Sequence, residues 1–383
     1  MNILALNWRC TRHPQAGGAE VNLFEQAKRW VEDGHEVTVF CSDPGREHAP
    51  ERDEIIDGIK VMRRGGRFTV YPHAAVFMLL NSRRFDRVLD IANGIPFFAP
   101  LFSTRPAVLL IHHVHDRQWF AEFTLPLATV GWFLERRVVP ILYGRRPVIA
   151  VSPTTRDALI KTGVRGSRIR IVYNGVELPE RSSKRAYSGE RRIAYVGRIK
   201  RYKRLDRLVR MMPALSEEFP DVHLDIAGSG DDRPRIEALI EELGMGARIT
   251  VHGFVDDEKK AEILGRAAVF ATPSMHEGWG LSVIEANAHG CPAVAFDVPG
   301  LRAAIRPGET GRIAEDDSSF LKALAFFLRD AVARRRYSEA AERWAGRFTW
   351  EASARETLEI LYGADDASWT SGEKGELAGS GAS

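Results

Sequence analysis

The feature that most constrains this chain is an alternation of short apolar runs with amphipathic segments, which occurs in two series along 383 residues. The first unit is a strand over Asn2–Leu6, a helix over Ala19–Asp33 and a strand over Glu36–Cys41. Further buried strands are expected at 59–63, 87–91, 107–111, 148–151 and 169–172. Strands separated by helices are typical of a parallel sheet, so the pattern predicts an α/β fold.

A polar segment separates this series from a second one. Residues 179–191, PERSSKRAYSGER, contain almost no large apolar side chains and are the best linker candidate. After them, strands are expected at 193–196, 223–226, 249–251, 269–272 and 293–296, with helices at 205–219, 233–243, 257–266 and 281–289. We therefore expect an N-terminal domain over 1–180, a C-terminal domain over 190–348 and a disordered polar tail over 363–383.

Composition and charge exclude several classes of protein. Lysine plus arginine number 54 against 51 acidic residues, a net charge of +3 that argues against a protein devoted to coating nucleic acid. The three cysteines, Cys10, Cys41 and Cys291, are odd in number and far apart, which favours a reducing cytosol over a disulfide framework. The N-terminus resembles a first strand rather than a signal peptide, and no apolar run approaches the roughly 18 residues that span a bilayer.

In each of the two series, the loop after the first strand carries candidate ligand-binding residues. Gly17 and Gly18 lie between the first strand and the first helix, where glycine allows close backbone approach and the helix N-terminus offers N–H groups. A purely conformational use of glycine is equally compatible with this pattern. In the second series, residues 191–210 hold nine Lys or Arg against one acid, a local excess of +8. Arg198 and Lys203 come just after the strand, which suits a diphosphate, whereas the other cations are expected on a solvated surface.

The stretch HEGWGLSVIE, residues 276–285, follows the strand 269–272 and Pro273, so it is expected to be a loop that leads into a helix. Its glycines permit a tight path, and the first N–H groups of the helix would face a phosphate. A carboxylate in the loop could accept hydrogen bonds from sugar hydroxyls, and one about a turn into the helix could reach a ribose. The candidate donor-binding residues of the stretch are Glu277, Gly278, Gly280, Leu281, Ser282 and Glu285.

The third candidate is HHVHD, residues 112–116, directly after the apolar strand 107–111. Three histidines and an aspartate could bind zinc, but no further ligand set appears in the sequence. A histidine that contacts a substrate hydroxyl or phosphate is the favoured interpretation, and His residues that merely close a strand end remain the alternative.

Four segments together resemble the retaining glycosyltransferases of family 4, which have the GT-B fold. They are GGAE, GRIKRYKRLD, AGSGDDRPRIEAL and HEGWGLSVIEANAHGCPAVAFDVPG, and the similarity extends over residues 2–363. Glu277 and Glu285 stand in the family's E-x7-E arrangement. The resemblance implies two Rossmann-like domains that face each other across a cleft, with the terminal helix 349–362 returning to the first domain.

For the donor, the resemblance implies that Arg198 and Lys203 bind the diphosphate and act in catalysis. Glu285 would hold the ribose, and Glu277 would contact the transferred sugar. The loop of Gly17 and Gly18 would face the donor phosphates and sugar.

The resemblance also implies that a histidine lies near the reacting sugar; His113 is favoured, but the tandem leaves His112 open. Arg204 is a departure, since many relatives have Lys-Gly there. The reaction would be transfer from a nucleotide-diphosphate sugar, UDP or GDP most readily, to an acceptor hydroxyl with retention. No carboxylate nucleophile is evident, which suits front-face attack, and no cofactor or metal is expected to be required.

Other functions stay open on the sequence. A nucleotide-sugar epimerase, a phosphorylase or a non-catalytic nucleotide-sugar-binding protein could use the same scaffold. The acceptor is not encoded in any local motif. Residues 119–137, rich in aromatics and ending in two arginines, could form an interfacial helix at the inner face of a membrane or pack on the acceptor side of a cytoplasmic enzyme, which we favour.

Overall fold

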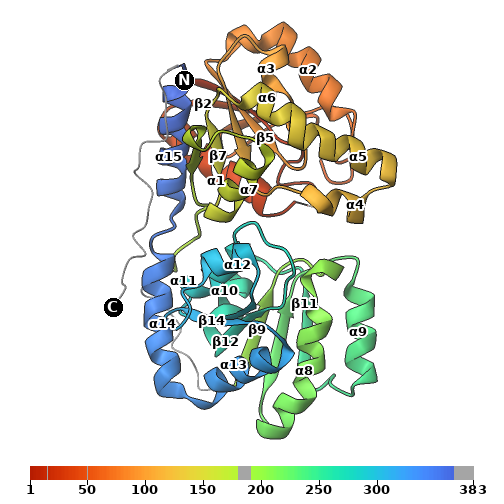
Figure 1. Cartoon of the computed structure of the whole chain (residues 1–383), viewed down its shortest axis with the longest axis vertical. Helices are drawn as coiled ribbons and strands as arrows, with labels where there is room; N and C mark the ends of the chain where they lie inside the picture. Colours follow the sequence, from red (N-terminus) through yellow and green to blue (C-terminus); the bar gives the residue numbers. More distant parts are fainter. Residues whose placement is uncertain (15, 50, 180–190, 366–383) are drawn as a thin grey trace. The chain divides into compact units, whose positions relative to one another are not determined.

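The structure is a computed structural model that describes residues 1–14, 16–49, 51–179 and 191–365. These residues form two compact units (Figure 1). Unit 1 combines Met1–Gly175 with the described residues from Trp350 onward, and unit 2 is Val176–Thr349. Nearly all of the predicted linker, and the predicted tail beyond residue 365, lie outside the described residues.

Unit 1 is built on an eight-stranded sheet in the order β3-β4-β2-β1-β5-β6-β7-β8. Its strands are β1 (Asn2–Leu6), β2 (Glu36–Cys41), β3 (Asp53–Ile56), β4 (Ile59–Arg63), β5 (Arg87–Ala92), β6 (Ala107–Ile111), β7 (Val148–Ala150) and β8 (Ile169–Ile171). All neighbours pair in parallel except β3 with β4. The central strands are buried along most of their length, because helices cover both faces of a parallel sheet.

The antiparallel strand β3 is absent from the sequence-based prediction. It pairs with β4 through a two-residue turn in which Asp57 and Gly58 both have positive φ, 49° and 79°. An Asp-Gly pair with this backbone is typical of a tight β-hairpin. The turn signal was therefore present in the sequence, but β3 is only four residues long, begins with two acids and has no buried residue.

The helices of unit 1 connect these strands. They are α1 (Gly18–Glu32), α2 (Val70–Asn81), α3 (Ala99–Phe102), α4 (Trp119–Glu122), α5 (Leu125–Phe133), a π-helical turn (Leu134–Val138), α6 (Val139–Tyr143), α7 (Pro153–Thr162) and α15 (Trp350–Tyr362). Helix α15 packs on α1: Trp30 Nε1 donates to the carbonyl of Ala354 at 2.9 Å, and Gln26 Nε2 donates to Ser353 Oγ at 3.0 Å. Helix α15 is thus part of unit 1, although it follows unit 2 in the sequence.

Unit 2 is a six-stranded parallel sheet in the order β11-β10-β9-β12-β13-β14. Its strands are β9 (Arg192–Val196), β10 (His223–Ala227), β11 (Ile249–Gly253), β12 (Val269–Thr272), β13 (Ala293–Phe296) and β14 (Gly311–Ala314). Its helices are α8 (Leu205–Glu218), α9 (Arg233–Glu242), α10 (Asp257–Arg266), α11 (Leu281–Ala288), α12 (Pro299–Ala304), α13 (Asp317–Arg329) and α14 (Ala331–Ala345). The two-unit α/β fold with parallel sheets is confirmed, and only β14 among these strands was not predicted.

The first strands of unit 2 carry different chemistry on their two faces. Successive side chains of a strand point to opposite faces. On one face, apolar residues of β9, β10 and β11 join a core with α8, α9 and α13. On the other face, Arg192, Asp225 and His252 lie near α10 and line a polar pocket.

Candidate active site

The loop before α1 is held in place by a buried carboxylate. Gly17 N donates to Glu20 Oε2 at 2.8 Å, and Arg9 Nε lies 3.2 Å from Glu20 Oε1. Gly17 has extended backbone, φ −154°, and a Cβ built there would meet nothing nearer than 3.8 Å. Local geometry therefore does not require glycine at position 17. The approach of a ligand, predicted for Gly17 and Gly18, stays a prediction.

The histidines after β6 form a half-buried cluster. His113 Nε2 lies 3.1 Å from His115 Nε2, and the ring of His115 stacks on Trp119 at 4.9 Å. The Nε2 of His112 is buried and has no hydrogen-bond partner among the described residues. Burial, helped by the neighbouring His113, lowers the pKa of His112 to about 3. His112 is therefore neutral at physiological pH.

A buried glutamate, which was not among the candidate residues from the sequence, supports this cluster. Glu135, in the π-helical turn, accepts hydrogen bonds from His115 N at 2.8 Å, Asp116 N at 2.9 Å and Trp119 Nε1 at 3.1 Å. Burial raises its pKa despite these three donors. Within the described ranges, no group of three His, Cys, Asp or Glu side chains has an arrangement that could hold a metal ion. Glu135 fixes the loop rather than a metal.

The burial of His112 has a consequence for stability. Its pKa lies far below the value of about 6.5 expected in the unfolded chain, so protonation favours unfolding. The stabilisation is complete above pH 6.5 and declines by about 1.4 kcal/mol per pH unit below it. We expect the free energy of unfolding of wild type relative to His112→Asn to fall by about 2 kcal/mol from pH 7 to pH 5 in urea titrations. If acid lowers the stability of His112→Asn as steeply as that of wild type, the burial of His112 is contradicted.

In unit 2, the structure brings together two residues that are 74 positions apart. Lys203 Nζ forms an ion pair with Glu277 Oε1, and the two side chains are 13% and 15% exposed. The backbone N–H of Met275 donates to the Tyr202 carbonyl at 3.0 Å, which ties the two loops. Arg198 Nη2 donates to Tyr202 Oη at 3.1 Å. Arg198, Lys203 and Glu277 thus belong to one set of interlocked loops.

Close backbone contacts set the path of these loops. A Cβ at Gly228 would lie 1.9 Å from the Gly197 carbonyl oxygen, and one at Gly230 would lie 2.0 Å from that of Ile199. Side chains larger than hydrogen at these positions would force the loops after β9 and β10 apart. The glycines of the AGSG segment therefore serve close loop packing.

The loop 276–280 ends at Gly280, whose φ of 75° lies in the left-handed region, and α11 begins at Leu281. Its N-cap residue is Gly280, which has no side chain that could cap the helix. The first N–H groups of the helix, including that of Ser282, are thus available at its positive end. Gly278 lies in the same loop, whereas Trp279 is buried and packs edge-on against Phe348 at 5.0 Å.

Glu285 in α11 has an ion-pair partner that does not belong to any of the sequence motifs. Lys260 Nζ, from α10, lies 3.0 Å from Glu285 Oε1 and 2.9 Å from Asp257 Oδ1. Burial alone would lower the pKa of Lys260, but the two carboxylates outweigh it and raise the pKa above the ordinary value. Lys260 fixes the orientation of the carboxylate predicted to hold a ribose.

The basic segment 191–210 is less cationic in the folded chain than in the sequence. Five of its cations form ion pairs with acids from elsewhere: Arg191 with Asp221, Arg192 with Asp225, Lys200 with Asp231, Lys203 with Glu277 and Arg207 with Asp317. The prediction that these cations lie on a solvated surface did not include the ion-pair partners that several of them have. Distant acids compensate much of the local excess of +8.

Arg204, the departure from Lys-Gly, has φ 52° and ψ 35°, a left-handed backbone that glycine adopts without strain. Its Nη1 lies 3.2 Å from Met275 Sδ. We expect Arg204→Gly to raise the free energy of unfolding by up to about 1 kcal/mol in urea titrations, since relief of strain exceeds the loss of this weak contact. Arg201→Gly, at a position without positive φ, should lower it by about 0.5–1 kcal/mol. Destabilisation of equal size in both variants would contradict strain at Arg204.

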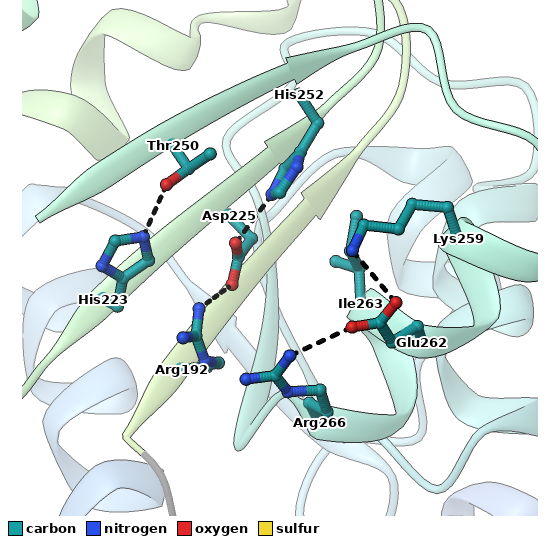
Figure 2. A pocket seen from close by; sticks show the side chains of 9 residues that line it. All are labelled: Arg192, His223, Asp225, Thr250, His252, Lys259, Glu262, Ile263 and Arg266. Atoms are coloured by element: carbon teal, nitrogen blue, oxygen red, sulfur yellow. Dashed lines mark hydrogen bonds and ion pairs between the residues drawn. The ribbon is translucent and has the colours of Figure 1, made fainter.

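A polar pocket of about 260 Å³ lies elsewhere in unit 2, between β9–β11 and α10 (Figure 2). Figure 2 shows Arg192 and His252 directed at Asp225. A nitrogen of each lies 2.8 Å from a carboxylate oxygen of Asp225. Glu262 is paired in the same way, with Lys259 and Arg266, both at 3.0 Å. None of the predicted site residues lines this pocket, and its carboxylates are all paired.

Comparison with known proteins identifies related families for both units. Residues 177–344 match the family model described as Glycosyl transferases group 1, and residues 16–180 match the one described as Glycosyltransferase Family 4. A D-inositol 3-phosphate glycosyltransferase of Nocardia farcinica is 29% identical and covers 90% of this chain and 84% of its own. One of Corynebacterium urealyticum is 33% identical, over 44% of this chain and 42% of its own length, so this match spans less than half of that relative.

Solved structures share the fold at low sequence identity. Sucrose-phosphate synthase from Thermosynechococcus elongatus has a TM-score of 0.79 at 21% identity and covers 96% of this chain and 100% of its own. The Anabaena protein Alr3699/HepE, solved with UDP and glucose, has a TM-score of 0.74 at 19% identity and covers 94% and 99%. These similarities show the fold alone.

Proposed function

The chain belongs to the family 4 glycosyltransferases, whose fold is GT-B, and on that basis we propose that it transfers a sugar from a nucleotide-diphosphate sugar to an acceptor hydroxyl with retention of configuration. The observation that carries the proposal is the ion pair of Lys203 with Glu277 beside Arg198 and the start of α11. Cations and a free helix N-terminus suit a diphosphate, and a carboxylate suits sugar hydroxyls. One set of loops therefore offers groups for both halves of a donor.

The proposal gives a role to the main candidate site residues of unit 2. Arg198, Lys203 and the N-terminus of α11 near Ser282 stabilise the charge that develops on the departing diphosphate. Glu277 binds the transferred sugar, and Glu285, oriented by Lys260, binds the ribose. Lys203 exchanges its contact with Glu277 for the donor phosphate when the donor enters. Catalysis is then mainly positioning and charge stabilisation.

The reaction proceeds by front-face attack. The acceptor oxygen forms the new glycosidic bond on the face that the diphosphate leaves, the C1–O bond to the diphosphate breaks, and a phosphate oxygen of the leaving group accepts the acceptor proton. Gly17, Gly18, His112 and His113 belong to unit 1, and their roles toward the donor stay predictions. That the reaction requires no metal or cofactor stays a prediction.

UDP-sugars are the first donors to test, because a structural relative was solved with UDP and glucose. A thermal-shift screen of UDP-, GDP-, ADP- and TDP-sugars selects the donor. Product analysis with candidate acceptors, among them inositol phosphates, tests the reaction. Release of nucleoside diphosphate that depends on acceptor, with an α-linked product from an α-linked donor by NMR, supports the proposal. An epimerised donor, phosphate-dependent cleavage of a glycoside, or binding without turnover would indicate the epimerase, phosphorylase or non-catalytic alternative.

The sequence favoured packing on the acceptor side for residues 119–137, but because apolar side chains of this segment are exposed in the structure, we also propose that the enzyme works as a peripheral protein at a membrane surface. Among the described residues, no helix is both long and apolar enough to cross a membrane. Helix α5 nevertheless exposes large apolar side chains, among them Leu125 and Leu127. Trp119, in the segment that suggested an interfacial helix, is buried instead and would not contact lipid.

A further inference from the structure

Helix α5, the π-helical turn and α6 follow one another in unit 1 (Figure 1). This helical run carries apolar residues on its buried side and on its exposed side. Its inner stripe consists of the buried residues Ala128, Gly131, Glu135, Val139 and Tyr143. Its outer stripe, at the same helical spacing, consists of Leu127, Val130, Phe133, Arg137 and Ile141. A surface helix of a globular protein normally presents polar residues to water. The outer stripe instead exposes 52% of Leu127, 55% of Val130, 53% of Phe133 and 79% of Ile141.

The packing of the inner stripe keeps the side chains of the outer stripe exposed. A Cβ at Gly131 would lie 2.6 Å from Trp119 Cε3, so the helix backbone lies directly on the indole ring. Trp119 Nε1 donates to Glu135 at 3.1 Å, and Tyr143 Oη donates to Asp90 Oδ2 at 2.5 Å. The helix cannot rotate its outer stripe inward without breaking these buried contacts.

A hollow of about 690 Å³ lies at the end of this run, around α6 and the loop after α7. Ile141 lines it together with Arg145, Arg146 and Arg165, and no acidic residue does. None of these arginines, nor Arg137, forms an ion pair with an acid among the residues that the structure describes. In residues 191–210, by contrast, five of nine cations are paired. We call Arg145, Arg146 and Arg165 the arginine pocket.

We propose that the arginine pocket binds the phosphate groups of anionic phospholipids while the outer stripe enters the boundary between headgroups and acyl chains. Guanidinium groups bind phosphate through two parallel hydrogen bonds, and unpaired arginines beside exposed apolar side chains are typical of interfacial helices. A soluble anion would not account for the outer stripe, and a nucleic acid would not account for its apolar side chains. This inference rests on the proposed membrane association and names its partner.

The test uses the full chain and sedimentation with vesicles of phosphatidylcholine, with and without one-third phosphatidylglycerol. Each arginine near an anionic surface contributes about a fivefold increase in binding, so Arg145→Gln/Arg146→Gln/Arg165→Gln should weaken binding to anionic vesicles about 100-fold. The control Arg335→Gln/Arg336→Gln/Arg343→Gln removes three exposed charges from α14 and should change binding less than about threefold. Leu127→Gln/Val130→Gln/Ile141→Gln should also abolish sedimentation. Thermal melts of each variant verify folding.

Several results would overturn the inference. Equal binding of wild type and the pocket variant to anionic vesicles would leave membrane association standing but remove the headgroup role. Saturable calorimetric binding of inorganic phosphate that the pocket variant loses, without vesicle binding by wild type, would assign the pocket to a soluble anion. No binding of vesicles or phosphate would remove both the pocket and the membrane surface. Acceptor-dependent release of nucleoside diphosphate with a water-soluble acceptor should be unchanged in the pocket variant, so glycosyl transfer is judged separately.

Discussion

Replacing Lys203 with alanine is expected to lower kcat/KM for sugar transfer by about 10³-fold while the protein stays folded. The substitution removes a cation from the donor diphosphate and leaves the carboxylate of Glu277, which is 15% exposed, without its ion-pair partner. The measurement is initial-rate release of nucleoside diphosphate with the donor selected by the thermal-shift screen. The same variant should lose most of the thermal stabilisation by that donor.

Lys200→Ala is the matched control for this prediction. Lys200 lies three residues earlier, and its Nζ contacts Asp231 at 2.8 Å on a more exposed surface. Its removal should change kcat/KM less than about threefold, because exposed ion pairs contribute little. Comparable losses in both variants would indicate a diffuse electrostatic effect of the basic segment, and wild-type rates in Lys203→Ala would refute the site.

A double-mutant cycle with Glu277→Gln separates two effects of the pair. If Lys203 and Glu277 contact the donor as a unit, the double variant should be little worse than either single variant. Full additivity would mean that each residue acts independently and that the ion pair in the structure has no part in donor binding.

The sequence predicted elements more reliably than electrostatic environments, and the reason is physical. The period of apolar residues along a segment is local, so strands such as β1, β2 and β12 were predicted with the bounds that the structure shows. Ion pairing is not local: the five acids that pair with the basic segment lie outside it, at positions 221, 225, 231, 277 and 317. The local excess of +8 therefore overstated the charge of the site.

The same limit explains which site residues could be predicted. Glu277 and Lys203 belong to recognisable motifs, and the structure pairs them. Lys260 and Glu135 belong to none, because an ordinary helix and a π-helical turn position them against partners distant in sequence. No pattern along the chain could have revealed residues whose role is to orient a neighbour.

Gly300→Ala is expected to lower both stability and activity, although residue 300 carries no side chain that could contact substrate. A Cβ at this position in α12 would lie 2.0 Å from the carbonyl oxygen of Glu277 and 2.5 Å from its carbonyl carbon. Because the obstructing atoms are backbone, the loop that carries Glu277 must move away from α12. We expect a loss of about 1–3 kcal/mol in the free energy of unfolding, since overpacking of a close contact has costs in this range.

The displaced loop should also lower kcat/KM by about 10²-fold, since a shift near 1 Å in a positioning group costs about this much. Gly246→Ala is the matched control, because Gly246 is exposed and a Cβ there would meet nothing within 4 Å. Urea titrations and initial rates on both variants distinguish the two effects. A Gly300→Ala enzyme that is destabilised but fully active would contradict this prediction. It would show that the backbone position of Glu277 does not limit transfer, and that a flexible loop brings the carboxylate to the donor sugar.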